Sequence, residues 1–332
     1  MKYKHLIIKR VIILVMLLFT LIVLELTLGT VNIDLIRAIV DFNSLDGIIL
    51  ESRIIRTATS IFVGASCGLI GLGIQTLFKN PLAGPTTLGI NSGASLGVGL
   101  FYLIPNLSLN FDWFGLGFFA ILGALTFLFT LILAAGKALN LTFVLIIGLL
   151  LSYASYAVLE VILQISDSVA IKSYVFWGMG SFTRVTISSF LILAAISITG
   201  FLVVKKYATW LNIYALGDNE LKLLTQKSIT FNKRLLLIVF GVWTGVITCM
   251  VGPIAFVGIV VPNVLKILIK SSNMNKLLPL TCLFGAIIVL LADLISRGAI
   301  GGFVLPINAV LSVLGVPIII YFLVKRISGV RG

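Results

Sequence analysis

The chain has 332 residues, of which 60% are hydrophobic and only 11% are charged, and its mean hydropathy is +1.20. No water-soluble domain of this size has such a composition, so the chain is predicted to be a membrane protein with several spans. Its net charge of +13 needs no nucleic-acid partner, because a basic inner face against anionic lipid accounts for it.

Charge-free apolar stretches recur along the sequence, and several are long enough for more than one membrane crossing. The N-terminal segment has the basic lead and apolar core of a secretory signal. It lacks a small-x-small cleavage site, which favours an uncleaved first span over a cleaved signal. Breaks at charges, prolines and loop-like clusters predict one all-α domain over residues 1–332 with ten spans, near 6–28, 54–78, 86–104, 113–135, 142–165, 187–204, 234–251, 254–270, 276–293 and 306–324.

The positive charges indicate the orientation of these spans. With the N-terminus inside, 18 of the 24 lysines and arginines fall in predicted inner segments. Because cytoplasmic loops retain Lys and Arg, both termini are expected on the cytoplasmic side of the membrane.

Against this trend, six cations lie in predicted outer segments, and three of them flank the second and ninth predicted spans: Arg53, Arg56 and Arg297. Arg53 and Arg56 are three residues apart, so on a helix they share one face and can point together at a partner. Alternatively, these arginines snorkel to lipid headgroups or pair with Glu51 and Asp293. The sequence alone leaves both interpretations open.

The stretch NPLAGPTTLGINSGASLG follows the second predicted span and contains no charge. Pro81 and Pro85 bar a regular helix there, and broken backbone within a membrane is tolerated where it is buried in protein or lines a wet cavity. Gly89, Gly93 and Gly97 place small residues on one helix face, which allows close helix packing. Spacing alone favours a packing helix after a proline-marked turn.

The fifth predicted span carries polar groups that suit a wet pathway. An intramembrane carboxylate such as Glu160 is by default a functional hypothesis, although snorkelling to the outer interface explains it equally well. Three residues are assigned to the pathway: Ser152, Ser155 and Glu160. Asn140 and Thr142, at the inner start of this span, are predicted to lie where cargo is released inward. Glu25 and Asp293 lie near other span ends and are expected to be exposed at the outer interface.

The longest predicted inner loop, residues 205–234, mixes Leu, Tyr and Trp with charge. Its apolar residues are spaced so that short helices on either side of Gly217 would each present an apolar face. Gly217 followed by Asp218 is typical of a helix end and a following N-cap. The loop is either a membrane-lying amphipathic linker or a docking surface for a partner.

The sequence offers little for catalysis or metal binding. His5 is the only histidine, and Cys67, Cys249 and Cys282 lie in apolar segments where core packing is the expected role. No phosphate-binding GxxxxGK[ST] loop occurs. If transport is ATP-driven, the ATPase is therefore another polypeptide.

Several motifs resemble the signatures of the FecCD family, the permeases of importers for iron-siderophore, haem and vitamin B12. NPLA and LGINSGA resemble one signature, GPIAFVGIVVP a second, and AD with the following Arg297 a third. The residues that carry the resemblance include Asn80, Pro81, Gly89, Gly93, Gly252, Pro253 and Pro262. Asn263 departs from the histidine of many members, and Gly84 replaces a usual acid.

The resemblance implies a permease with the fold of a type II ATP-binding-cassette (ABC) importer, in a bacterial cell membrane. Its implied partners are a second permease, identical or sister, two cytoplasmic ATPases that carry ATP and Mg²⁺, an extracytoplasmic binding protein and membrane lipid. The implied cargo is an iron-siderophore complex, with haem or vitamin B12 as alternatives. The permease itself is expected to have no catalytic residue, metal or cofactor. Composition alone also permits a secondary transporter that needs no ATPase.

The resemblance further assigns two surfaces. The segment around Leu216, Gly217, Asp218 and Leu221 resembles the coupling helices that sit in a cleft of the ATPase. Arg53, Arg56 and Arg297 match the arginines that receive acidic side chains from the binding protein. A planar guanidinium suits that task because it holds a carboxylate with two parallel hydrogen bonds.

Overall fold

The computed structural model describes residues 2–29, 31–103, 113–134, 141–217, 229–297 and 304–329. All regular elements in this part of the chain are helices, as lipid requires of spans that must satisfy their own backbone hydrogen bonds. They are α1 (Lys2–Thr27), α2 (Leu35–Val40), α3 (Leu45–Leu77), α4 (Ile90–Leu103), α6 (Trp113–Ala134), α7 (Leu141–Ile165), α8 (Ser168–Gly178), α9 (Ile187–Leu216), α11 (Ile229–Val251), α12 (Val257–Ile269), α13 (Met274–Ser296) and α14 (Ile307–Gly329). The predicted all-α membrane fold is confirmed.

Ten of these helices correspond to the ten predicted spans. Seven are long and apolar enough to cross a membrane, and α4, α12 and the first part of α14 are shorter apolar helices. The remaining two, α2 and α8, were not predicted. Each begins after an aspartate, Asp34 or Asp167, whose side chain accepts hydrogen bonds from backbone N–H groups of the first turn.

Three predicted boundaries were wrong. Helix α3 begins at Leu45 because the Ser44 side chain caps it, so Arg53 and Arg56 lie inside the helix and not at its entrance. Helix α4 begins only at Ile90, because Gly89 has a left-handed φ of 72°. Helix α9 continues without a break to Leu216, so no separate short helix precedes Gly217.

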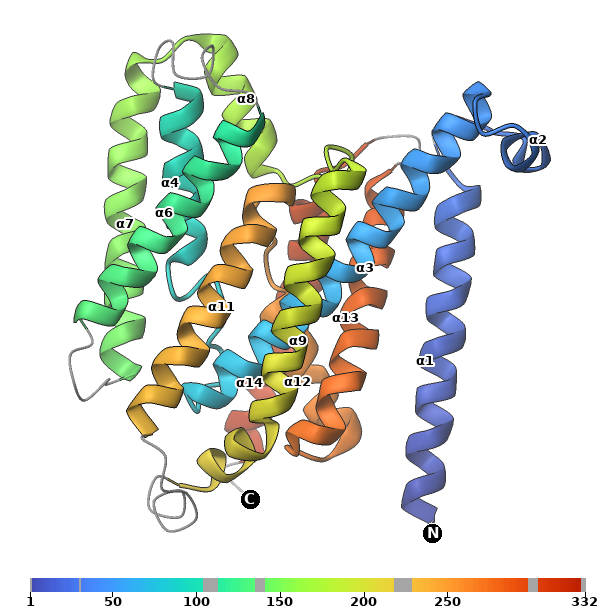
Figure 1. Ribbon diagram of the computed structural model, residues 1–332. Coiled ribbons are helices and arrows are strands. Elements are labelled where there is room, and N and C mark those ends of the chain that lie inside the picture. Colours follow the sequence, from blue (N-terminus) through green and yellow to red (C-terminus); the bar gives the residue numbers. More distant parts are fainter. Residues whose placement is uncertain are drawn as a thin grey trace.

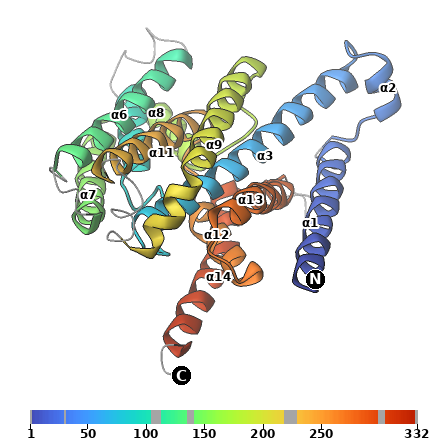
Figure 2. The ribbon, with the colours of Figure 1, turned by 60° about the horizontal axis from the view of Figure 1, so that its bottom comes forward.

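The helices run between two sides of the molecule, which we call the lower and the upper side after Figure 1. Helix α1 begins on the lower side, whereas α2 and α8 lie on the upper side. Helix α3 crosses the middle obliquely, and α1 and α7 lie at opposite edges in both views (Figure 1, Figure 2). The core therefore gathers around α3 and α11, most of whose side chains are buried.

Glycines set the closest helix contacts. A Cβ added at Gly64 would overlap the Gly285 carbonyl on α13, and one at Gly71 would overlap the Gly258 carbonyl on α12. On α4, Cβ atoms at Gly93 and Gly97 would overlap backbone carbonyls of α6. The predicted packing face of α4 is thus confirmed for these two glycines. The three cysteines are free, as expected.

Candidate functional site

The upper side holds a cluster of charged side chains between α1, α3 and α13. Asp293 accepts hydrogen bonds from Arg56, at 2.9 Å from Nε and 2.7 Å from Nη2, and from Arg297, at 3.1 Å from Nε and 2.9 Å from Nη2. Glu25 forms an ion pair with Arg297, which also donates to the Glu25 carbonyl at 3.1 Å. We call Glu25, Arg56, Asp293 and Arg297 the arginine-carboxylate cluster.

The burial of this cluster corrects one expectation from the sequence. Glu25 is 0% exposed and Asp293 1% exposed, so neither lies at an open interface. Their burial follows from the packing of α1 against α13, because arginines from α3 and α13 then neutralise both carboxylates. The arginine pairing considered for Asp293 is confirmed, whereas a docking role stays a prediction.

Arg53 takes a different position, although it lies on the same helix as Arg56. The residue is 6% exposed, and its guanidinium donates to the carbonyls of Leu26 at 2.8 Å and Thr27 at 3.0 Å. These bonds hold carbonyls at the C-terminal end of α1, which have no partner within their own helix. Arg53 therefore ties α1 to α3, whereas the Arg56 side chain is 18% exposed.

A cavity of about 430 Å³ lies between α4, α7, α8 and the start of α14. Its polar lining consists of Thr86, Asn91, Ser92, Ser95, Ser152, Tyr153, Ser155, Tyr156, Tyr174 and Asn308, and none of the described residues that line it is charged. We call it the middle cavity. Ser152 and Ser155, both predicted pathway residues, face this space. Glu160 is exposed on α7 and is not among the residues that line it.

Hydroxyl groups dominate the chemistry of the middle cavity. Ser152 Oγ donates to the Gly148 carbonyl at 2.8 Å, whereas the buried Ser155 Oγ has no hydrogen-bond partner in the described part of the chain. Burial raises the pKa of Tyr174 to about 12, with a smaller contribution from Tyr156. The Tyr174 hydroxyl therefore stays protonated and able to donate a hydrogen bond at physiological pH.

Both interrupted segments reach the middle cavity. Asn308 Nδ2 donates to the Pro253 carbonyl at 2.6 Å, and its Oδ1 accepts from the Ala255 N–H at 3.2 Å, so one amide holds the break before α12. Gly252 adopts φ +80° there. Gly89, at the other break, packs against the Gly148 carbonyl of α7. The cavity-lining role that the sequence left open is thus present beside the packing role.

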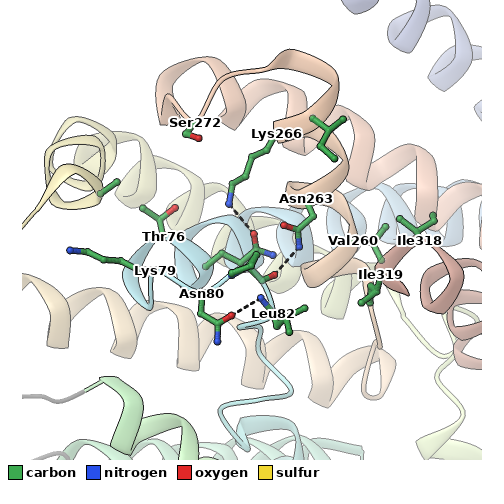
Figure 3. Close-up of a pocket in the computed structure, with 14 residues that line it drawn as sticks. Thr76, Lys79, Asn80, Leu82, Val260, Asn263, Lys266, Ser272, Ile318 and Ile319 are labelled. Atoms are coloured by element: carbon green, nitrogen blue, oxygen red, sulfur yellow. Dashed lines mark hydrogen bonds between the residues drawn. The ribbon is translucent and has the colours of Figure 1, made fainter. Parts of the chain in front are cut away.

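A second cavity, of about 500 Å³, opens on the lower side between the end of α3, the turn after it, α12 and α14 (Figure 3). We call it the lower pocket. Asn80 Oδ1 accepts from the Leu82 N–H at 2.9 Å, which shapes the turn. Asn263 Nδ2 donates to the Pro81 carbonyl at 2.7 Å, which joins α12 to that turn. Asn263, which departs from the family histidine, therefore has a structural partner.

The lower end of α9 contacts the same turn. Tyr214 stacks on Trp210 with ring centroids 5.2 Å apart, and the Nζ atoms of Lys79 and Lys233 each lie 4.7 Å from the Tyr214 ring centroid. Lys79 immediately precedes Asn80. A displacement of this helix end would therefore change the packing around Lys79, beside the turn that borders the lower pocket.

The structure describes only some of the remaining predicted site residues. Leu216 ends α9 with 75% of its surface exposed. Gly217 has φ 164°, an extended conformation that any residue adopts, so no left-handed backbone demands glycine there. Thr142 is exposed at the start of α7. Three other predicted residues lie outside the described part of the chain: Asn140, Asp218 and Leu221.

Sequence reasoning missed the residues that join these parts. Asn308 and Tyr174 border the middle cavity, and Lys266 borders the lower pocket. A lysine inside an apolar segment is a signal that could have identified Lys266. Asn308 and Tyr174 are ordinary polar residues, and only the tertiary fold shows what they face.

Known proteins resemble this chain in both sequence and fold. The model of the FecCD transport family matches residues 15–325. Vitamin B12 import system permease proteins named BtuC, from Citrobacter koseri and Salmonella typhimurium, are each 34% identical over 276 residues. The match covers 83% of this chain and 82% and 83% of those proteins.

Solved structures share the fold. One described as an inward-facing conformation of a metal-chelate type ABC transporter has a TM-score of 0.83 at 26% identity, covering 96% of this chain and 99% of that one. PsaBC from Streptococcus pneumoniae has a TM-score of 0.59 at 19% identity, covering 82% of this chain and 90% of that one, and supports the fold alone.

Proposed function

Because the chain belongs to the FecCD transport family and is the permease of a bacterial ABC importer, we propose that it carries an iron-siderophore complex into the cytoplasm. It would work with a second permease, two ATPase subunits and an extracytoplasmic binding protein. The lower side would face the cytoplasm, in agreement with the excess of lysine in the predicted inner segments. A transporter that needs no ATPase is not compatible with this family.

The lining of the middle cavity carries the proposal for the cargo. An iron chelate of this class is bulky, polar at its rim and partly aromatic. Tyrosine, serine and asparagine side chains offer it weak hydrogen bonds and ring contacts, and no fixed charge among the lining residues that the structure describes would retain it. Such a surface suits low-affinity passage, because a pathway must release what it admits.

Vitamin B12 is the second candidate cargo. It is favoured by the BtuC relatives, whose names refer to vitamin B12 import, whereas the metal-chelate transporter of similar fold favours a chelate. Haem, the third cargo class of the family, has no such observation in its favour. The middle cavity is compatible with both leading candidates, so a measurement of uptake has to distinguish them.

The experiment is uptake by a strain that lacks this permease and by the same strain complemented with it. We expect complementation to restore uptake of ⁵⁵Fe supplied as siderophore complexes, while ⁵⁷Co-cobalamin uptake is unchanged. Restored cobalamin uptake without restored ⁵⁵Fe uptake would assign vitamin B12 instead. Restoration of neither would overturn the proposed function.

Docking of the binding protein is proposed at the upper side through Arg56, the more exposed arginine of the cluster. Replacing Arg56 with Gln leaves Arg297 paired with Asp293. We expect association with the binding protein to slow about threefold or more at low ionic strength, and less at high ionic strength, because rim charges act mainly on encounter. Surface plasmon resonance at two salt concentrations measures this association rate.

The control for this measurement is Arg37→Gln, which replaces an exposed arginine on α2. Equal rates in both variants would remove Arg56 from the docking surface.

Coupling to the ATPase is proposed at the lower end of α9, where Leu216 is exposed. We expect Leu216→Asp to lower ATP-dependent uptake about fivefold, equivalent to about 1 kcal/mol of docking free energy, because an apolar anchor is lost. The fold should be unaffected, since the side chain makes few contacts within the chain. Leu45→Asp, at an equally exposed leucine on the upper side, should leave uptake unchanged. Equal uptake in the two variants would argue against a coupling role.

A further inference from the structure

Lys266 is a cation that borders the lower pocket. Its Nζ donates to Gln75 Oε1 at 3.0 Å, and no carboxylate in the described part of the chain lies within 4 Å of it. An ammonium has three N–H donors, so donors remain for a ligand. Figure 3 shows the Lys266 side chain reaching down from α12 toward the end of α3.

The wall below Lys266 is held in place by its own hydrogen bonds. Gln75 Nε2 donates to the Ile259 carbonyl at 3.2 Å, which leaves Oε1 to orient the lysine. Asn263 Nδ2 is used by the carbonyls of Pro81 and Ile259. Two lysines border this pocket: Lys79 Nζ lies 4.7 Å from the Tyr214 ring centroid, whereas Lys266 Nζ lies among the neighbouring amides, which position it.

Apolar residues of two helices form one wall of the pocket, whereas Thr76, Lys79, Asn80 and Ser272 add polar groups elsewhere in the lining. Val260, Ile267, Ile318 and Ile319 border the pocket from α12 and α14. A pocket of about 500 Å³ that is bordered by two lysines, several polar groups and an apolar wall fits a ligand that combines an anionic oxygen with an aromatic or aliphatic body. Lysines are point charges on flexible stems, and they retain such a ligand only weakly.

The lower pocket and the middle cavity lie one after the other along the same two elements of the chain. On α14, Asn308 borders the middle cavity and Ile319 the lower pocket. These residues are eleven positions apart, which is about three turns and about 16 Å along one helix face. The turn after α3 likewise contributes Thr86 to the middle cavity and Leu82 to the lower pocket. The same two elements thus border both spaces in succession.

We infer that the lower pocket is an exit site for anionic cargo, in which the Lys266 ammonium holds a carboxylate or catecholate oxygen of the chelate before release. The inference rests on the proposed function and narrows its cargo to chelates with net negative charge. The pathway would then be uncharged in the middle and attract anions at its lower end. This site differs from the release point that the sequence predicted near Asn140 and Thr142.

The test measures the electrostatic field of the pocket directly. A cysteine is placed at Ile319 in a chain whose three native cysteines are replaced by serine, and the full chain is reconstituted in nanodiscs. Two water-soluble thiol reagents of opposite charge are compared, sulfonatoethyl and trimethylammonioethyl methanethiosulfonate. We expect the ratio of anionic to cationic labelling rates to fall about fivefold or more in Lys266→Gln, because a nearby cation concentrates anions.

Matched variants separate the charge from the fold. Lys266→Arg keeps the charge and should keep the ratio, and Lys276→Gln, an exposed lysine on the same side, should leave it unchanged. A ferric tris-catecholate, which is a trianion, should slow labelling of the Ile319 cysteine in the parent chain. A neutral ferric tris-hydroxamate should not slow it.

Three results would overturn the inference. A ratio unchanged by Lys266→Gln would show that the lysine does not set the field. Equal protection by the two chelates would show no selection for charge, and labelling by neither reagent would show a pocket filled by lipid or protein. None of these measurements requires uptake. Failure of the iron-uptake experiment with the parent chain would therefore count against the proposed function separately.

Discussion

Replacing Asp293 with asparagine is expected to destabilise the protein by about 3–5 kcal/mol, the largest effect of any single charge removal. Asp293 is 1% exposed and accepts hydrogen bonds from both Arg56 and Arg297. Without its charge, two guanidinium groups would share the one carboxylate of Glu25 inside the bundle. The loss is measured by the midpoint of unfolding in detergent and by the yield of monodisperse protein.

The matched control is Glu51→Gln, which removes an exposed acid from α3. A surface substitution of this kind should change the unfolding free energy by less than about 0.5 kcal/mol. If Asp293→Asn unfolded at the same midpoint as the control, the arginine-carboxylate cluster would not contribute to the packing of α1, α3 and α13. A parallel measurement on Glu25→Gln tests whether Arg297 needs both acids.

Replacing Gly71 with alanine is expected to prevent close packing of α3 against α12. The added Cβ would overlap the carbonyl oxygen and carbon of Gly258, which are backbone atoms that no rotamer change moves aside. Overpacking costs about 1–3 kcal/mol where side chains adjust, and backbone contact puts this site at or above that range. We expect a large loss of folded protein and of uptake, because both cavities depend on the position of α12.

Gly178→Ala provides the control, since a Cβ at Gly178 meets nothing within 4 Å. Alanine also favours a helix over glycine, so this variant should fold at least as well as the parent chain. Equal thermal stability of the two variants would mean that α3 and α12 separate readily. The close contact of Gly71 with Gly258 would then not be essential to the fold.

The order of the helices could be predicted from the sequence because lipid constrains the backbone. A backbone in hydrocarbon has to be helical, so each long apolar stretch became a helix in the structure. The interruptions at Pro81 and before α12 were equally readable, because proline and glycine act on the backbone locally. The family could also be identified from the sequence, because its signatures lie at these interruptions and each is a continuous stretch of residues.

The charged residues were less predictable. Position along a span suggested that Glu25 and Asp293 face the outer interface, and the structure buries both. What decides their environment is which helix packs beside them, and helices as far apart in sequence as α1 and α13 meet only in the folded bundle. The extra length of α9 was missed because lysines after residue 204 resembled a loop, whereas long cationic side chains also suit a helix that leaves the membrane.

The sequence by itself determined the membrane class, the ten apolar helices, the two broken segments and the family. These follow from composition and local backbone chemistry, which act within a few residues. Only the tertiary structure decided that Arg56 and Arg297 converge on Asp293, that Asn308 holds the break before α12, and that Lys266 donates to Gln75 at the lower pocket. Hydrogen bonds and charge pairs act over a few ångströms in space, so residues hundreds of positions apart acquire partners only when the helices pack.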